Sequence, residues 1–453
     1  MRRVLEEQRY LEFTGDASPK VVKAFREKYG KISRKLDESP LILWLVNEDL
    51  RSLSTSDGGR GAVYTSEMLF RALLVHQIEK TSLRETVIRV AESETLRSFV
   101  RLGHRPMMDY SFLDRAFKAI TPETWGLVNQ ELARRAARKG EIDIATLRAD
   151  STVVEGNIHY PTDTSLLWDS YRVLSRVLRV VRDAVPEYCP HRFHDRKAKK
   201  DMVYVNRYMR SKSQPRRREM KLRFRRLLES VRRLSEIARP LPRKLAGSLD
   251  PDLAWASAQL KRYLPLVRTV CDTAERAGLK GETVPASDRV FSIFEDHVEL
   301  IQRGKSRHPT EFGHAVWLAQ TREKFITDYE TMERKVPDTE LLDEIVGRHK
   351  VAFGSHPNVI AADTGFRAAP DEMAKIEEIV ETVAVPGRGL SRAKIARHWH
   401  RFRAGIEGSI SVLKRAFRLS VCMYRSFKSF AAAVGMAVFC HNLITLTYKR
   451  APA

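Results

Sequence analysis

The C-terminal segment HWHRFRAGIEGSISVLKRAF, residues 398–417, carries four side chains whose types and spacing suit chemistry on a phosphate backbone. They are His400, Arg403, Glu407 and Lys414, in the order aromatic-x2-Arg-x3-Glu-x6-Lys. On a helix, Arg403 and Glu407 lie one turn apart and Lys414 lies two turns beyond Glu407, so these three share one face. A carboxylate can hold a hard metal ion, and cations beside it can bind phosphates. The pattern therefore indicates a site that cuts or joins nucleic acid strands.

Two aspartates upstream follow predicted strands. Asp150 closes the alternating part of IDIATLRADST (142–152), and Asp363 closes the apolar run in NVIAADTGF (358–366). Aspartates at the carboxyl ends of buried strands lie at the rim of a sheet, where open α/β proteins place their active sites. Together with Glu407, these aspartates could converge on a pair of Mg²⁺ ions.

With these acids in view, the chain resembles the DDE transposases of bacterial insertion sequences, in particular the ISNCY-like group that carries the Tyr-x2-Arg-x3-Glu-x6-Lys signature. The segments ADSTVVEGNIHYPTDTSLLWD (149–169) and FSIFEDHVELIQRGKSRHPTEFGHAVWLAQTRE (291–323) resemble the first-aspartate and middle regions of that group. The similarity extends over nearly the whole chain. His400 stands where the group has its tyrosine, and histidine is also planar and able to bond to phosphate.

The resemblance implies an RNase H-like core and a two-metal mechanism with Mg²⁺, for which Mn²⁺ can substitute. Asp150, Asp363 and Glu407 would be the catalytic and metal-binding residues, with Asp150 bridging both ions. The implied reaction is hydrolysis at the element ends, followed by transfer of the freed 3′-hydroxyls into target DNA. The implied partner is double-stranded DNA, as terminal inverted repeats and as target, bound by a homodimer.

Three other functions remain open on the sequence. A metal nuclease that cleaves without joining would use the same three acids. A non-catalytic DNA-binding protein derived from a transposase would have no chemical need for all three. An RNA-binding protein is permitted by the charge alone.

The composition favours a polyanionic partner. There are 80 Lys and Arg against 57 Asp and Glu, a formal net charge of +23, and nucleic acid is the first candidate for such a surplus. No amphipathic anchor or lipidation signal points to a membrane. The charged N-terminal segment has no apolar signal-peptide region, and the four cysteines form no C-x-x-C pair, so we expect a reducing cytoplasm and association with the nucleoid.

We expect an α/β fold in which the RNase H-like core is interrupted by a basic all-α insertion. Residues 1–140 would be a helical DNA-end-binding or dimerisation domain, residues 141–168 and 286–453 the two parts of the core, and residues 169–285 the insertion. In the first of these, Ser82-x-x-Glu85 and Ser111-x-x-Asp114 predict helix starts. Residues 69–93 read as a helix-turn-helix or as a plain helical hairpin.

The predicted insertion is locally basic. Between Arg192 and Lys244 there are 20 Lys and Arg against 5 Asp and Glu, which favours contact with the DNA backbone over a solvated hairpin or a disordered segment around residues 211–218. Residues 219–238 and 251–278 predict its helices. Trp168 is expected in the core, with stacking on a displaced base as the alternative. The DNA-binding candidates are His400, Arg403, Lys414, Arg216, Arg217, Arg218, Arg225, Arg226 and Lys305.

The second part of the core is expected to alternate strands and helices. We predict strands at 289–296 and in a hairpin over 311–330, a helix at 338–350, a strand before Asp363, and an acidic helix at 371–383. A short strand at 383–385, a helix at 392–418 and a buried apolar helix at 431–446 follow. This order is consistent with an RNase H-like core.

Overall fold

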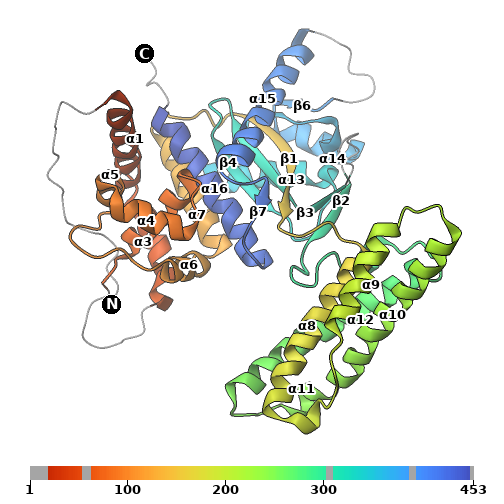
Figure 1. Cartoon of the computed structure of the whole chain (residues 1–453). Helices are drawn as coiled ribbons and strands as arrows, with labels where there is room; N and C mark the ends of the chain where they lie inside the picture. Colours follow the sequence, from red (N-terminus) through yellow and green to blue (C-terminus); the bar gives the residue numbers. More distant parts are fainter. Residues whose placement is uncertain (1–18, 54–62, 303–309, 387–393, 449–453) are drawn as a thin grey trace. The chain divides into compact units, whose positions relative to one another are not determined.

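The computed structural model describes residues 19–53, 63–302, 310–386 and 394–448. The chain divides into two compact units: unit 1 comprises residues 1–157 and 313–453, and unit 2 comprises residues 158–312 (Figure 1). Unit 1 is a mixed α/β structure, and unit 2 is mainly helical, with a short strand at Glu299–Gln302. The chain is therefore α/β with a large helical component, as predicted, and the compact unit 2 extends beyond the expected insertion at both ends.

The N-terminal part of unit 1 is helical, as predicted. The helix cap expected at Ser82 is confirmed, because its side chain accepts a hydrogen bond from the Glu85 backbone N–H. The cap expected at Ser111 is wrong: the Asp109 side chain accepts from the Ser111 backbone N–H at 2.8 Å, so Asp109 caps the helix. The helices are α1 (Lys20–Asp37), α2 (Pro40–Leu50), η1 (Arg51–Leu53), α3 (Ser66–Ile78), α4 (Leu83–Glu92), α5 (Glu94–Phe99), α6 (Tyr110–Ala119) and α7 (Pro122–Arg138).

Helices α3 and α4 form the helical pair predicted for residues 69–93. The turn between them includes Lys80 in the left-handed region, at φ 54°. Every residue of α3 is buried, whereas α4 exposes one side, including Ile88. The two helices are thus confirmed, and the binding of DNA by this pair stays a prediction.

The sheet is mixed. The order of its strands is β2-β3-β1-β5-β6, with β4 also paired to β3 and β7 to β1. Strand β3 pairs antiparallel with both β1 and β4. Strands β5 and β7 pair parallel with β1, and β6 pairs parallel with β5. The strands are β1 (Thr146–Gly156), β2 (Glu299–Gln302), β3 (Thr310–Thr321), β4 (Ile326–Thr331), β5 (Val359–Ala361), β6 (Thr382–Ala384) and β7 (Val421–Cys422).

Two strand predictions need correction. Asp150 does not end its strand: β1 continues to Gly156, because β3 pairs with it from Leu147 to Glu155. Residues 289–296 form no strand. There the Ser292 side chain accepts hydrogen bonds from the backbone N–H groups of Phe294 and Glu295, a local turn that competes with a sheet ladder.

The C-terminal elements follow the predicted order of helix, strand, helix, strand and helix. The apolar helix α16 is confirmed as a core helix, since 89% of its most apolar 18-residue window is buried. It packs on α7, α1 and α3. Its length and composition alone would allow it to cross a membrane, but the core helix of a soluble protein meets the same criteria. The helices are η4 (Asp338–Glu340), α13 (Leu341–Phe353), η5 (Thr364–Phe366), α14 (Pro370–Ile379), α15 (Lys394–Ala416) and α16 (Phe427–Tyr448).

Unit 2 is built around its own apolar core, formed where its long helices lie side by side (Figure 1). A capping box begins α8, because Thr162 and Ser165 exchange side chain–backbone hydrogen bonds. The predicted helix at 251–278 is confirmed, and the region around 211–218 enters a helix rather than a disordered segment. The helices are α8 (Asp163–Ala184), η2 (Pro186–Tyr188), α9 (Asp195–Tyr208), α10 (Gln214–Ala238), α11 (Leu241–Lys244), α12 (Pro251–Gly278) and η3 (Ala286–Asp288).

Candidate active site

Arg403 joins two of the three predicted acids. Its guanidinium lies 3.1 Å from the Glu407 carboxylate, one turn along α15, and 3.9 Å from the Asp150 carboxylate on β1. The side chains of Arg403 and Asp150 are 15% and 13% exposed, whereas that of Glu407 is 63% exposed. Residues far apart in the sequence thus meet at the surface of the sheet, with Glu407 open to solvent.

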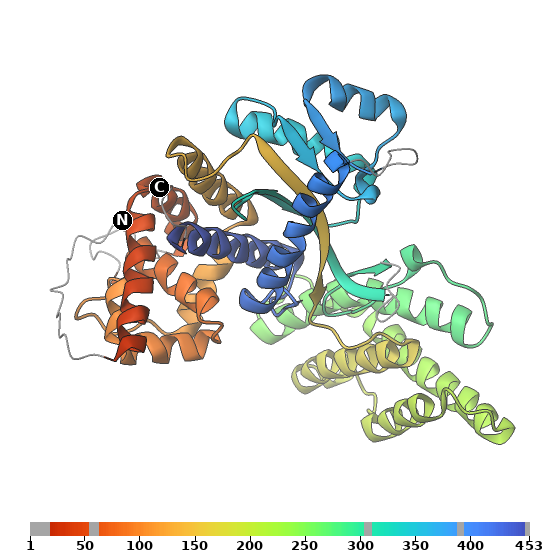
Figure 2. The same cartoon turned by 90° about the horizontal axis from the view of Figure 1, so that it is seen from above.

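Arg148 fixes the helix that carries Arg403 and Glu407. Arg148 and Asp150 are two residues apart on β1, so their side chains point to the same face. The buried Arg148 guanidinium donates to the backbone oxygen of Phe402 on α15 at 2.8 Å, and to the Gln320 side chain on β3 at 2.9 Å. Burial lowers the pKa of Arg148. Figure 2 shows α15, in blue, against the golden strand β1.

Gly405 allows this close approach of α15 to β1. A Cβ atom at Gly405 would overlap the Arg148 guanidinium, so a side chain there would force that guanidinium to move away from its hydrogen bond to Phe402. At Gly408, three residues further along the same helix, a Cβ would meet no atom within 4 Å. The glycine at 405 therefore leaves the space that the Arg148 guanidinium occupies, and the glycine at 408 has no such role.

Asp363 follows β5, as predicted, and caps the short helix η5 by accepting from the Gly365 backbone N–H at 2.8 Å. The last pair between the parallel strands β1 and β5 joins Arg148 to Ala361. Asp150 and Asp363 each stand two residues beyond that pair, Asp150 still on β1 and Asp363 in the turn after β5. The register therefore brings the two chain segments together, and the meeting of the two carboxylates stays a prediction.

Asp338 is an acid that the sequence analysis did not single out. Its Oδ2 atom accepts from the Ser151 hydroxyl at 2.9 Å, and both Asp338 and Asp363 line the position of a Cβ at Gly365. The other carboxylate oxygen of Asp338 is buried and has no hydrogen-bond partner among the described residues. A carboxylate thus lies beside Ser151, the residue next to Asp150. No spacing in the sequence marks it, because it precedes a helix rather than following a strand.

The donor set of this site fits a hard cation in its chemistry. Asp150, Asp363 and Glu407 offer carboxylate oxygens, which Mg²⁺ prefers. In the described ranges, however, no group of three or more His, Cys, Asp or Glu side chains already lies in an arrangement that could hold a metal. A cation does stand between two of the acids, namely the Arg403 guanidinium.

The other candidates on α15 have different settings. His400 is exposed, and Lys414 is half-buried near the end of the helix, where its backbone oxygen accepts from the Ser420 hydroxyl. Lys305 lies outside the described residues.

The basic candidates on α10 fall into two groups. Arg216, Arg217, Arg218 and Arg225 are exposed. Arg226 instead points to the buried Asp201 of α9, with its Nε 3.2 Å from that carboxylate. Its charge is used in packing α10 on α9, which makes it a weaker candidate for binding phosphate.

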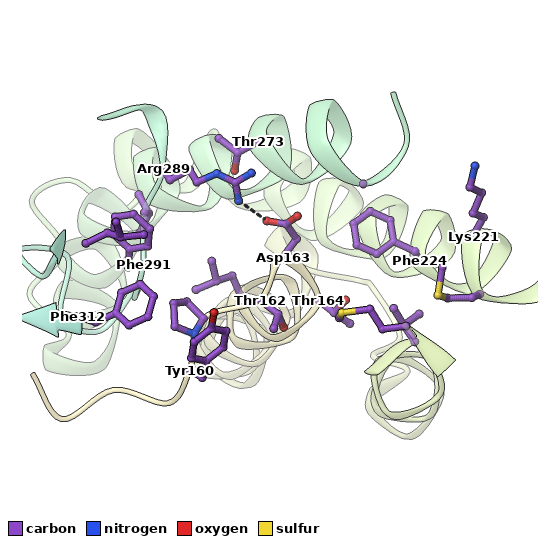
Figure 3. A pocket seen from close by; sticks show the side chains of 18 residues that line it. Tyr160, Thr162, Asp163, Thr164, Lys221, Phe224, Thr273, Arg289, Phe291 and Phe312 are labelled. Carbon is purple, nitrogen blue, oxygen red and sulfur yellow. Dashed lines mark hydrogen bonds and ion pairs between the residues drawn. The ribbon is translucent and has the colours of Figure 1, made fainter. Parts of the chain in front are cut away.

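Unit 2 also encloses a pocket of about 440 Å³, shown in Figure 3. Asp163 and Arg289 form an ion pair of 3.1 Å at this pocket. Burial raises the pKa of Asp163, against the opposing charge of Arg289. The rings of Tyr160, Phe291 and Phe312 gather on one side of the pair, and Phe224 lies on the other.

Trp168 does not line that pocket. It is half-buried against the core of unit 2, parallel to the ring of Tyr171 with 5.9 Å between centroids. This packing supports the predicted core position.

Comparisons of the chain with protein-family models, with characterised proteins and with solved structures find no match in any of the three. The interpretation of the site therefore rests on its own residues and their geometry.

Proposed function

We propose that this protein is a DDE-type transposase of an insertion sequence. The observation that carries the proposal is the Arg403 bridge, which brings Glu407 of the C-terminal signature to Asp150 of the central strand. If Glu407 only formed an ion pair with Arg403 along the helix, the second ion pair, between Arg403 and Asp150, would have no role. Asp363, which follows the adjacent strand β5, would supply the third carboxylate.

The order of elements supports an RNase H-like core. Strand β1, the hairpin β3–β4, helix α13, strand β5, helix α14, strand β6 and helix α15 follow one another as expected for such a core, with unit 2 inserted after β1. The three acids come from the central strand, its parallel neighbour and the helix packed on them. This arrangement concentrates negative charge at one place on the sheet.

Each residue of the site has a role in this proposal. Asp150, Asp363 and Glu407 would hold Mg²⁺, or Mn²⁺ in its place, and the metal would activate the attacking oxygen and stabilise the leaving one. Arg403 neutralises the repulsion between Asp150 and Glu407 and offers its remaining N–H groups to a phosphate. Arg148 and Gly405 keep α15 seated on β1.

The partner in this proposal is double-stranded DNA, first as the terminal repeats of the element and then as the target. Exposed arginines of α10 suit contact with the phosphate backbone, as do His400 and Lys414 on α15. Two ends must be paired for transposition, so we expect a homodimer on DNA, acting at the nucleoid.

The test is a cleavage and joining assay on a labelled duplex that carries the terminal repeat flanking the gene. We expect cuts at the repeat end and longer joined products with Mg²⁺, and neither with EDTA or with Glu407→Gln. Cuts without joined products would indicate a metal nuclease. Tight binding without any metal-dependent product would contradict the proposal and indicate a DNA-binding protein.

A further inference from the structure

Helix α9 in unit 2 carries a row of exposed cations on one side and buried residues on the other. Ala198, Asp201 and Val205 are buried, at the spacing of a helix face that packs on α10. The exposed cations recur at helical spacing along the opposite side. They are Arg196, Lys199, Lys200 and Arg207.

Aromatic side chains support this row of cations. Together with α10, the cations line a shallow groove of about 480 Å³ that also contains Tyr204 and Tyr208. The Arg223 guanidinium lies 4.1 Å from the centroid of the Tyr204 ring, and Arg216 lies 5.0 Å from that of Tyr208. Guanidinium groups held flat on rings keep their N–H edges available for phosphate oxygens.

The charge of the row is not compensated within the described part of the chain. The two acids of α9 are engaged elsewhere, since Asp195 pairs with Arg179 of α8 and Asp201 pairs with Arg226 of α10. None of the four exposed cations has a carboxylate within ion-pair distance there. A cluster of unneutralised cations repels itself, so an anion that binds along it gains free energy by relieving that repulsion.

We propose that this α9 surface, formed by Arg196, Lys199, Lys200 and Arg207 with Tyr204 and Tyr208, binds the phosphate backbone of duplex DNA. The row spans about 16 Å along the helix, which matches about five nucleotides of one strand of B-DNA. Binding here is independent of sequence. The inference rests on the proposed function, because it takes DNA as the partner, and it adds a contact in unit 2 separate from the acids of unit 1.

An anionic membrane is a poorer occupant. A helix that lies on a lipid surface must bury its apolar side in the lipid. The apolar side of α9 is already buried in the core of unit 2.

The experiment measures binding of the full-length protein to a fluorescein-labelled duplex by anisotropy, over a series of salt concentrations. The test variant combines Lys199→Ala, Lys200→Ala and Arg207→Ala. A matched control removes three exposed cations from α11 and α12, namely Arg243→Ala, Lys261→Ala and Arg268→Ala. Both variants lose the same net charge, so a difference between them reports position.

We expect the slope of log K against log salt to fall by about 3 in the test variant, because three phosphate contacts are lost. The loss of affinity should be equal for the terminal repeat and for an unrelated duplex. Tyr208→Leu, which removes the ring under Arg216, should give a smaller loss of the same kind. A slope equal to that of the control variant would overturn the proposal.

The joining assay separates this inference from the proposed function. If the wild-type protein joins ends but the test variant keeps the wild-type salt slope, only the proposal that the α9 surface binds DNA is contradicted. Wild-type protein whose binding depends on the α9 surface, but which shows no metal-dependent product, would contradict the transposase alone. Wild-type protein that does not bind duplex DNA would contradict both.

Discussion

At the scale of single residues, two arginines set the candidate site. Arg403 brings Asp150 and Glu407 together by charge, and Arg148 holds the same helix by donating to the backbone of Phe402. Arg403 acts on the largely buried Asp150 and the exposed Glu407, and Arg148 acts from a buried position. Removal of Arg403 should therefore affect the two acids directly, whereas removal of Arg148 should affect the position of α15.

Gly405→Ala should reduce the joining activity by about 100-fold, because the new Cβ displaces the Arg148 guanidinium from its hydrogen bond to Phe402 and so releases the helix that carries Glu407. Gly408→Ala is the matched control, with open space around the added methyl group, and should stabilise α15 by about 0.5–1 kcal/mol. Single-turnover assays and thermal melts of both variants would check this. Equal activity in the two variants would show that the close packing at Gly405 is unimportant.

Arg148→Lys should lower the rate of the chemical step while leaving the affinity for DNA unchanged. A lysine keeps the charge but cannot reach Phe402 and Gln320 together, so we also expect a loss of about 1–3 kcal/mol in unfolding free energy. Comparing DNA affinity with single-turnover rate at a temperature where the variant is folded would test this. Weaker DNA binding with an unchanged rate would place Arg148 outside the positioning role.

The residues that could be predicted from sequence are those with a spacing that chemistry requires. Asp150 and Glu407 were predicted to lie together, and the ion pairs of Arg403 link them. Arg148, Gly405 and Asp338 were missed, because their importance comes from what packs against them in three dimensions. A cation between two apolar residues, Leu147 and Ala149, was the one signal that could have drawn attention to Arg148.

At the scale of elements, Asn442 couples helix α16 to the sheet. Its side-chain oxygen accepts from the Ile326 backbone N–H at 2.9 Å, and its amide donates to the Ile326 backbone oxygen at 2.8 Å. A single buried side chain thus completes the hydrogen bonds at the start of β4. A strand edge is satisfied here by a helix rather than by another strand.

Asn442→Leu should lower the unfolding free energy by about 3 kcal/mol, because it leaves the two backbone groups of Ile326 buried without partners. Urea unfolding would measure the change. Asn206→Leu, at an exposed position on α9, is the control and should change stability little. A loss at Asn442 no larger than in the control would show that solvent replaces its hydrogen bonds.

The elements that were predicted well have strong local signals. Helix α12 begins after Asp250, whose side chain caps it, and ends at Gly278, as the sequence indicated. The strand predicted at 289–296 failed, since alternation of apolar residues there was outweighed by the turn at Ser292. Alternation gives no information on which partner strand is present, and a strand without a partner does not form.

At the scale of the whole molecule, buried histidines make unit 1 sensitive to acid. Burial lowers the pKa of His76, His349 and His441 from the ordinary 6.5 to about 4. Between these values the unfolded chain binds more protons than the folded chain, so stability falls as the pH falls from about 6.5 toward 4. Each histidine should contribute a loss of about 2 kcal/mol between pH 7.5 and 5.

His349→Leu should reduce that loss by about 2 kcal/mol, because it removes one titrating group whose Nε2 atom is buried with no hydrogen-bond partner in the described part of the chain. Urea unfolding at pH 7.5 and pH 5.0 would measure the difference. The exposed His104→Leu is the control and should keep the full acid dependence. Identical acid dependence in the His349 variant and in wild type would contradict a neutral, buried His349.

The most direct test of the central claim measures joined DNA products in Mg²⁺ for wild type beside Asp150→Asn, Asp363→Asn and Glu407→Gln. Asp371→Asn, an exposed acid on α14, is the control. We expect joined products for wild type and for the control, and none for the three site variants, all of which should still bind the duplex. Joining that survives in any of these three site variants would contradict the proposed catalytic site.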